Sequence, residues 1–201
     1  MKHSVNKPSA DRPFSSLREY QNSGFSRRVP QPIEALWLLV QWLLVASWLP
    51  GSSHRRFLLR LFGASIGKGV VLKPGIRVKI PSRLMVGDHS WIGEDVWIDN
   101  LARVWIGANC CISQGAYICT GSHNWGRHGF DLITGEVGIG DGAWIAARSI
   151  VGPGVKIGQG AVLALGSVAT ANLEDWSVYR GNPAVFCRSR NINELASAAA
   201  N

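Results

Sequence analysis

The stretch Ile106–Ile118, which reads IGANCCISQGAYI, decides the fold because an aliphatic residue returns at every sixth position. The same spacing continues over most of the chain. The fifteen positions of the series are Ile66, Leu72, Val78, Val86, Ile92, Ile98, Ile106, Ile112, Ile118, Ile139, Ile145, Val151, Ile157, Leu163 and Ala169. A period of six fits neither the 3.6 residues of a helical turn nor the alternation of an ordinary strand. It is typical of a solenoid in which each short strand supplies one inward residue before a turn.

Two irregularities in the spacing give the size of one coil. The step lengthens from six to eight residues between Val78 and Val86, and again between Ile98 and Ile106. Both extensions follow three strands, so three strands form one triangular coil. The sequence therefore predicts an all-β fold, a parallel β-helix of about five triangular coils over residues 66–180. With about 4.8 Å between stacked strands, the prism would be roughly 24 Å tall.

Two further regularities concern the corners of the coils. The residue four positions after the aliphatic residue is nearly always small, and this set includes Ser82, Ala102 and Ser122. A second inward position at a narrow corner would require a small side chain. Glycine often follows the aliphatic residue directly, as at Gly87 and Gly140, and tight corners often need a glycine backbone.

The segments that flank the repeats have a different composition. Residues 1–32 are rich in Ser, Pro, Arg and Lys without an apolar period, and we expect a flexible basic leader there. Residues 33–62 predict an apolar helical segment that continues into a basic amphipathic piece. Residues 181–201 form a short C-terminal tail. These two segments are natural covers for the ends of the β-helix.

The apolar run at residues 33–49 has three interpretations. It contains no Lys or Arg over seventeen residues, which is at the lower limit for a membrane span, and Glu34 interrupts it. The run can be a helix packed on the end of the core or in an oligomer interface. It can also lie in a membrane interface, with Trp37, Trp42 and Trp48 as anchors. A true span is the third interpretation.

Composition and charge narrow the function classes. The formal net charge of +8 favours polyanionic partners, which are nucleic acid, an anionic membrane surface or a phosphorylated cofactor. We do not expect nucleic acid binding, because the basic residues are dispersed and no recognition helix is visible. The four cysteines form neither a CxxC pair nor a zinc spacing, and no secretory signal is visible, so we expect reduced thiols in a cytoplasmic protein.

The repeat series breaks once. Ile118 and Ile139 are 21 residues apart where one step would span six, and the excess is a loop over residues 122–136. A loop that leaves a rigid wall is a candidate for function. His123 stands where the regular coil stops, so the wall holds its backbone while its ring can face solvent or a partner. Histidine is the side chain whose ordinary pKa suits a general base near neutral pH.

Several motifs together resemble the hexapeptide acyltransferases. They are the repeats from Ile66 to Thr170, the loop opening TGSH at Thr120–His123, the block IGDGAWIAA at Ile139–Ala147, and the closing RGNPA at Arg180–Ala184. The chain is most similar to the colanic acid biosynthesis acetyltransferases, and the resemblance covers about residues 50–190. It implies a left-handed parallel β-helix and a homotrimer, with acetyl-CoA and acceptor meeting between adjacent prisms.

The resemblance also implies a function. It is that of an O-acetyltransferase, which moves acetyl from acetyl-CoA to a sugar hydroxyl in the biosynthesis of a colanic-acid-like exopolysaccharide. The acceptor would be a sugar or a lipid-linked glycan, and no metal is expected. A lipid-linked acceptor would place the protein in the cytoplasm at the inner face of the membrane, with peripheral contact through residues 33–49.

Motif position assigns candidate residues for base and acceptor. His123 matches the catalytic base, against the alternative of a structural loop histidine. Asn100 matches the asparagine on the acceptor side, against an ordinary turn residue. Trp125 is a candidate for stacking on a sugar face, against simple loop packing. Family members often carry Asp after the histidine; Asn124 stands there instead, which leaves a backbone carbonyl as a way to hold the ring.

Motif position likewise assigns the coenzyme to the later coils. The candidates are Trp144, Ala146, Ala147, Gly166, Ser167, Thr170, Arg180 and Arg188, largely through backbone groups and, for the arginines, through the phosphates. The sequence departs from the sugar acetyltransferases at two positions: Ala171 follows Thr170 where they have Lys, and Val185 replaces a basic residue. We therefore expect weaker affinity for the coenzyme.

Two other function classes compete. The γ-class carbonic anhydrases hold zinc with three histidines on this type of fold, two of them five residues apart, as His123 and His128 are here, with His89 upstream. A non-catalytic trimeric scaffold, with the apolar helix as its working part, is the second alternative. Against zinc, His128 lies in a loop outside the repeat register, so no wall fixes its direction.

Overall fold

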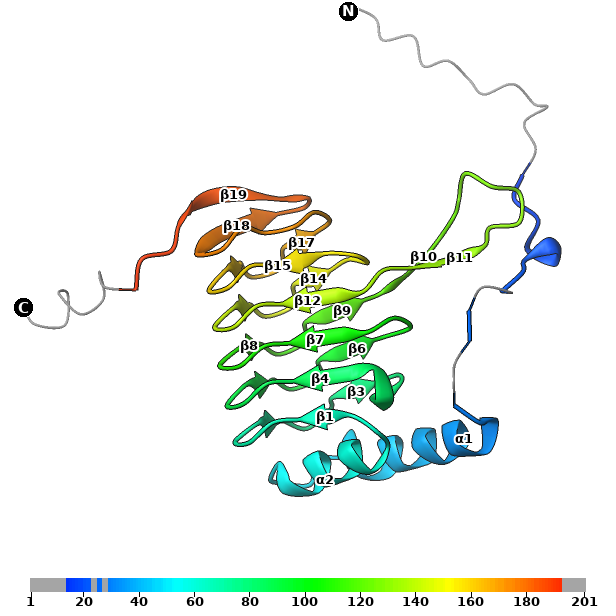
Figure 1. Ribbon diagram of the computed structural model, residues 1–201, viewed down its shortest axis with the longest axis horizontal. Coiled ribbons are helices and arrows are strands. Elements are labelled where there is room, and N and C mark those ends of the chain that lie inside the picture. Colours follow the sequence, from blue (N-terminus) through cyan, green and yellow to red (C-terminus); the bar gives the residue numbers. More distant parts are fainter. Residues whose placement is uncertain (1–13, 23–24, 27–28, 193–201) are drawn as a thin grey trace, which may run out of the picture. The chain divides into compact units, whose positions relative to one another are not determined.

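A computed structural model describes residues 14–22, 25–26 and 29–192 (Figure 1). The described residues form two compact units. The loop unit joins the N-terminal segment up to Ser26 with Ser122–Ile133, and the prism unit contains Arg27–Gly121 and everything from Thr134 onward. Most of the expected basic leader, and the end of the expected tail from residue 193, lie outside the described residues.

The prism unit is a parallel β-helix with three sheets as its walls. The first sheet contains β1 (Ser65–Ile66), β4 (Leu84–Val86), β7 (Val104–Ile106), β12 (Val137–Ile139) and β15 (Lys156–Ile157). The second contains β2 (Val71–Leu72), β5 (Trp91–Ile92), β8 (Cys111–Ile112), β13 (Trp144–Ile145), β16 (Val162–Leu163), β18 (Ser177–Gly181) and β19 (Ala184–Ser189). The third contains β3 (Arg77–Val78), β6 (Trp97–Asp99), β9 (Tyr117–Cys119), β14 (Ile150–Val151) and β17 (Val168–Ala169). Five coils follow from β1 to β17, as the spacing predicts.

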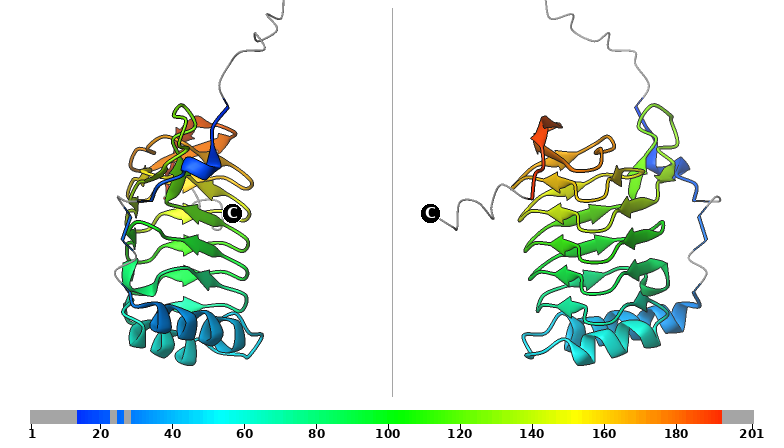
Figure 2. Two further views of the ribbon diagram at one scale, coloured as in Figure 1. Left: turned by 90° about the vertical axis from the view of Figure 1, so that its right-hand side faces the viewer. Right: turned by 60° about the vertical axis from the view of Figure 1, so that its left-hand side comes forward.

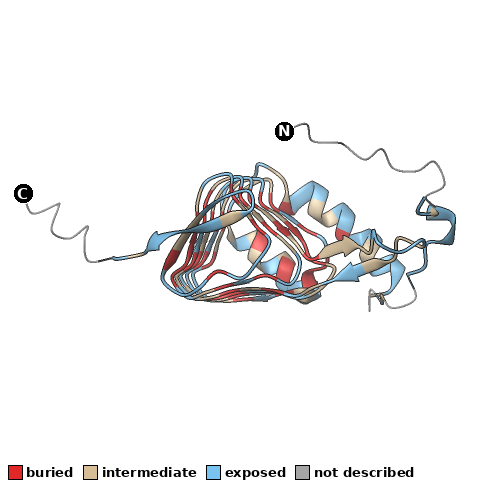
Figure 3. Cartoon of the chain, turned by 90° about the horizontal axis from the view of Figure 1, so that it is seen from above, coloured by how far each residue is buried: buried red, intermediate tan, exposed pale blue. Residues whose placement is uncertain are grey.

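The fifteen aliphatic positions of the series form the core of the prism. Each is at most 7% exposed, and the burial colours of Figure 3 show the buried positions stacked along the walls. The strand register places each residue over its counterpart in the next coil, as in Ile92 with Ile112 and Ile112 with Ile145. Because every strand pairs with the coils on either side, the apolar ladder and the hydrogen bonds stabilise the same stacking. The predicted inward positions are confirmed.

The prediction of small inward residues fails in the first three coils at one of the three corners, whereas Val155 at the same corner of the fourth coil is buried as predicted. Ser82 is exposed and Ala102 is half-buried, while Ser122 already belongs to strand β10 (Gly121–His123). The two-residue extension shifts the chain here. The buried residues at this corner are Ile80, Asn100 and Thr120, two positions after the aliphatic residue instead of four.

Close approach of the coils, rather than an unusual backbone angle, explains the glycines after the first-sheet aliphatic residues. A Cβ at Gly87 would lie 2.5 Å from the amide nitrogen of Ala108, and one at Gly140 would lie 2.7 Å from that of Gln159. Real Cβ atoms do not approach backbone this closely, so any side chain would push neighbouring coils apart. The glycines therefore set the coil spacing at this corner.

Helices close the end of the prism next to β1 (Figures 1 and 2). They are α1 (Gln31–Val40), the π-helical turn η2 (Gln41–Val45) and α2 (Ser53–Leu61). Trp37 is 2% exposed, and its indole N–H donates to the Val78 carbonyl at 2.8 Å. The Gln41 side-chain carbonyl accepts from the Val78 N–H at 2.6 Å. Among the described residues, no helix has both the length and the apolar character that crossing a bilayer requires.

The opposite end of the prism continues the second sheet. Leu173 forms a parallel bridge with Ile157, β18 pairs with β16, and β19 folds back antiparallel on β18. The short 3-10 turn η3 (Pro81–Arg83) occupies the extended corner before β4. All four cysteines are free; Cys110 is buried, and burial raises the pKa of its thiol.

Candidate functional site

The break in the repeats is a β-hairpin. Strand β10 (Gly121–His123) pairs with β11 (Leu132–Thr134), and the Gly135 N–H donates to the Thr120 carbonyl at 2.9 Å where the chain returns to the prism unit. Within the loop, the Asn124 N–H donates to the Asp131 carbonyl at 2.8 Å. The hairpin thus gives His123 a strand position instead of a free loop position.

The His123 ring is held by Phe130 through two contacts. Its Nδ1 lies 2.9 Å from the Phe130 carbonyl oxygen, and the two rings stack with centroids 4.5 Å apart and planes 7° apart. A carbonyl only accepts, so Nδ1 must carry the proton and Nε2 is left with the lone pair. Among the described residues Nε2 has no hydrogen-bond partner. This is the tautomer that a general base needs.

The N-terminal segment adds a third ring to this cluster. Tyr20 lies 5.8 Å from the His123 ring, centroid to centroid, just after the short 3-10 helix η1 (Leu17–Glu19). Two further contacts join the segment to the loop: the Ser16 N–H donates to the His128 carbonyl at 2.8 Å, and the Glu19 carboxylate lies 3.4 Å from His128 Nε2. Nothing in the repeat pattern predicts that residues 14–22 belong with the His123 loop.

The other acceptor candidates lie in contrasting surroundings. Trp125 is 82% exposed on the loop, so its indole face is open. Asn100 has no exposed surface. Its Oδ1 accepts from the Ile80 N–H at 2.9 Å, and its Nδ2 donates to the Ile80 carbonyl at 2.7 Å. The amide of Asn100 is therefore occupied inside the corner, and the structure favours the alternative of a turn residue over contact with a sugar.

Two of the coenzyme candidates share one row on the second sheet. Register places Trp144 beside Val162, Val162 beside Val178, and Val178 beside Arg188. Three strand spacings separate Trp144 from Arg188, which is about 14 Å. The Trp144 ring is 44% exposed, with its N–H donating to the Ser113 hydroxyl at 2.9 Å. Arg180 and Arg188 are both exposed on the terminal hairpin.

Four further coenzyme candidates lie at the corner after the second sheet. Gly166 is exposed, with φ +65°, and its N–H donates to the Ala147 carbonyl at 3.0 Å. Ala146 is buried, and its N–H donates to Leu163. Ser167 is also buried, with its hydroxyl accepting from the Gly181 N–H at 2.9 Å. Ala147 and Gly166 leave surface at this corner, whereas Ala146 and Ser167 are buried. The exposed Thr170 follows β17 and lies at the next corner, after the third sheet.

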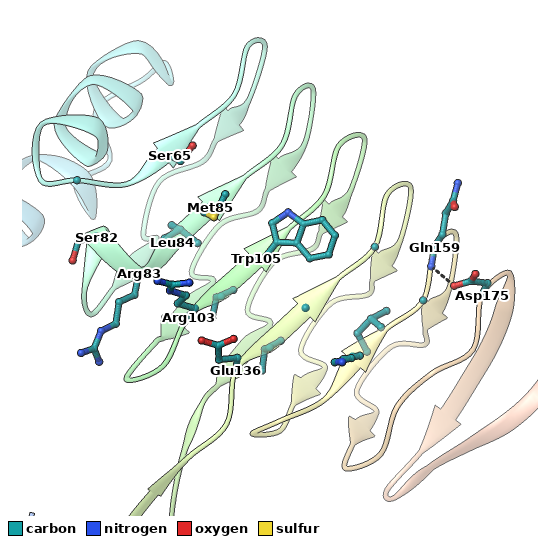
Figure 4. A pocket seen from close by; sticks show the side chains of 18 residues that line it. Ser65, Ser82, Arg83, Leu84, Met85, Arg103, Trp105, Glu136, Gln159 and Asp175 are labelled. Atoms are coloured by element: carbon teal, nitrogen blue, oxygen red, sulfur yellow. Dashed lines mark hydrogen bonds between the residues drawn. The ribbon is translucent and has the colours of Figure 1, made fainter. Parts of the chain in front are cut away.

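A groove of about 880 Å³ runs along the first sheet, and Figure 4 shows its lining. Met85 and Trp105 are neighbours in register and are each about half exposed, and Arg103 and Glu136 lie at one edge. No candidate from the sequence falls in this groove. The sequence does contain a signal for aromatic side chains on the outer surface of the walls. An aromatic residue directly before an inward aliphatic residue must point outward, because side chains alternate along a strand. Trp91, Trp105 and Trp144 all have this position.

The described residues contain no group of three or more His, Cys, Asp or Glu side chains placed to hold a metal ion. The three histidines of the zinc alternative have other surroundings. His123 contacts Phe130, and His128 lies beside Glu19. His89 is exposed at a corner of the prism, with φ +59°.

No family model matches the chain. The colanic acid biosynthesis acetyltransferase WcaF of Escherichia coli (strain K12) is 43% identical over 157 residues, which are 77% of this chain and 86% of that protein. A hexapeptide-repeat acetyltransferase of Vibrio cholerae O1 biovar eltor, VCA0836, complexed with acetyl coenzyme A, has a TM-score of 0.74 at 22% identity, over 88% of this chain and 99% of that one. A maltose O-acetyltransferase from Clostridium difficile 630 has a TM-score of 0.72 at 23% identity, over 81% and 90%.

The two solved structures are less than a quarter identical to the chain and show its fold alone. The sequence match to WcaF extends over most of both proteins, at a level that identifies a family. The chain therefore belongs to the colanic acid biosynthesis acetyltransferases, within the hexapeptide-repeat acetyltransferases.

Proposed function

We propose that the protein transfers the acetyl group of acetyl-CoA to a hydroxyl group of a sugar, with Nε2 of His123 as the general base. The observation that carries the proposal is the 2.9 Å contact between His123 Nδ1 and the Phe130 carbonyl, which selects the tautomer with a free Nε2. The acetyl coenzyme A in the Vibrio cholerae structure supports the choice of donor. The name of the E. coli relative supports an acceptor in exopolysaccharide biosynthesis.

In the proposed reaction the sugar oxygen attacks the thioester carbonyl carbon while Nε2 takes the hydroxyl proton. The carbon–sulfur bond then breaks, and the proton on Nε2 passes to the departing thiolate of the coenzyme. Through both steps the Phe130 carbonyl keeps the Nδ1 proton in place and stabilises the imidazolium. General-base assistance of this kind contributes about 10²- to 10⁴-fold to the rate.

For the coenzyme, we place the extended arm along the outward row of the second sheet, beside Trp144 and the corner of Ala147 and Gly166. The exposed Arg180 and Arg188 are the proposed phosphate contacts, since guanidinium groups bind phosphate through paired hydrogen bonds. Ala171 and Val185 carry no charge, so fewer cations contribute than the family pattern has.

For the acceptor, we propose a sugar or a lipid-linked glycan that stacks on Trp125, whose indole is 82% exposed. We also propose that three copies assemble. The half-exposed Met85 and Trp105 in the groove of the first sheet, and Trp91 and Trp144 on the second, supply apolar surface for contacts between copies. Light scattering would give the mass of three chains if this holds.

The test is release of free CoA from acetyl-CoA with a panel of glycan acceptors, combined with mass spectrometry of the acceptor. We expect acceptor-dependent release and an acceptor heavier by one acetyl group. Arg188→Ala should raise the KM for acetyl-CoA several-fold with little change in kcat, and Arg188→Lys should recover part of the loss. Acceptor-independent hydrolysis, one bound zinc per chain, or no turnover with any glycan would each contradict the proposal.

A further inference from the structure

The helices at the end of the prism are fixed to it by one side only. Trp37 and Val45 are 2% and 0% exposed and pack in the core. Arg55 of α2 has no exposed surface, and its guanidinium donates to the carbonyls of Val45, Ser47, Leu49 and Gly51. These contacts hold α1, η2 and the following turn rigidly against the first coil, so the side of α1 and η2 that faces away from the prism has a defined direction.

That outer side is apolar. Nine large hydrophobic residues between positions 33 and 49 are between 39% and 75% exposed: Ile33, Leu36, Leu38, Leu39, Trp42, Leu43, Leu44, Trp48 and Leu49. We call this set the basal apolar face; it belongs to α1, η2 and the turn that follows, and Figure 1 shows α1 at the end of the prism next to β1. Soluble proteins rarely leave so many neighbouring large hydrophobic residues in contact with water unless the surface binds something.

Positive charge is concentrated next to the basal apolar face. Residues 31–87 contain eight Lys and Arg and one acidic residue, Glu34, whereas residues 88–201 contain seven Lys and Arg and ten acidic residues. The first coil carries Lys68, Lys73, Arg77 and Lys79, all exposed. Lys73 and Lys79 are paired with acids of the second coil at 3.6 and 2.8 Å, while Arg77 stacks on Trp97. Residues 31–87 thus carry a formal net charge of +7, against −3 for residues 88–201.

An anionic bilayer surface is the partner that uses both features. A protein partner could cover the leucines without any use of the neighbouring Lys and Arg. Nucleic acid could bind the Lys and Arg but would leave the leucines in water. Anionic lipid headgroups attract the basic coil while the acyl boundary accepts the apolar side chains. Indole rings such as those of Trp42 and Trp48, with an apolar body and one N–H, favour that boundary.

The geometry fits a helix that lies in the interface. The fifteen residues of α1 and η2 extend about 22 Å, which is shorter than the roughly 30 Å of the hydrocarbon core. Their inner side is occupied by the prism through Trp37 and Val45. We propose that the basal apolar face, with the basic first coil around it, docks the protein on the surface of a bilayer that contains anionic lipid.

Docking by the base would direct the prism away from the membrane. The chain leaves the prism unit toward the hairpin after Gly121, at the end of the third coil, which is two strand spacings or about 10 Å beyond the first. For an enzyme that acetylates a glycan on a lipid carrier, docking would bring the protein to the surface where its acceptor is held. This consequence rests on the proposed function, whereas docking itself does not.

The experiment is flotation of the full chain with vesicles, without acetyl-CoA or acceptor. Phosphatidylglycerol in phosphatidylcholine is compared with phosphatidylcholine alone. We expect binding to the anionic vesicles, little to the neutral ones, and loss of most binding in 0.5 M salt, an ionic strength at which screening acts within about 5 Å. The double variant Trp42→Ala with Trp48→Ala should bind at least tenfold more weakly. Lys68→Glu with Arg77→Glu should lower binding to a similar degree.

The matched control is Trp176→Ala, which removes a 42% exposed tryptophan just before β18, at the opposite end of the prism, and should leave vesicle binding unchanged. Circular dichroism and light scattering of every variant establish that fold and assembly are intact. Equal binding to neutral vesicles, no binding to either type, or association of the chain with itself through the basal apolar face would each overturn the proposal. Because the readout needs no turnover, its failure is separate from failure of acetyl transfer.

Discussion

At the scale of single residues, the polar atoms of His123 and Asn100 have opposite situations. The sequence predicts both at the site, one as base and one as a sugar contact. In the structure Asn100 is buried, with its Oδ1 and its Nδ2 both bonded to the Ile80 backbone, while His123 uses Nδ1 on Phe130 and keeps Nε2 free. For both residues the sequence provides the same kind of evidence, which is residue type and position in a motif. Only the neighbours decide which side chain has an atom left for chemistry.

Asn100→Ala is therefore expected to lower stability. It leaves the buried Ile80 N–H without a partner, and the Ile80 carbonyl keeps only the Arg83 N–H at 3.0 Å, so the free energy of unfolding should fall by about 2 kcal/mol in urea denaturation. Asn172→Ala is the matched control, because its Oδ1 accepts from the Lys156 N–H on an exposed surface and should cost less than about 1 kcal/mol. Unchanged stability of Asn100→Ala with a raised KM for the acceptor would return Asn100 to the sugar site.

At the scale of elements, the helices at the base of the prism are held by a few side chains, with Trp37 on α1 and Arg55 on α2. The sequence predicts a helical segment there and leaves its packing open among the core, a membrane interface and a span. The structure packs α1 on the core through Trp37 and leaves most of its large apolar side chains exposed. Spacing could not separate the first two interpretations, because α1 has apolar residues on both sides.

Arg55→Met tests how the helices are held. Four carbonyls at the end of η2 and in the turn to α2 would lose their donor, and the free energy of unfolding should fall by about 3 kcal/mol or more. Arg56→Met is the control: its guanidinium donates to the Val70 carbonyl and to the Ser53 hydroxyl, and about 1 kcal/mol is expected. Equal effects of the two variants would mean that Arg55 does not fasten the base.

At the scale of the whole molecule, the sequence predicts the coils well because one repeated physical requirement acts at every strand. Each inward aliphatic residue must lie over the next, so a period of six and a three-strand coil can be counted directly. The corner with the two-residue extensions could not be predicted in this way, because its inward residues Ile80, Asn100 and Thr120 differ in type. The contacts of Tyr20 and Phe130 with His123 could not be predicted from the spacing either, because they join segments that contain no repeat.

His123→Ala is the most direct test of whether Nε2 of His123 is the base in acetyl transfer. The measurement is kcat for acetyl transfer to the best glycan acceptor, with circular dichroism, assembly and acetyl-CoA binding checked in the same preparation. We expect kcat to fall by about 100-fold or more, with fold, assembly and acetyl-CoA binding unchanged. Undiminished kcat in His123→Ala, at intact fold and coenzyme binding, would contradict this role of Nε2.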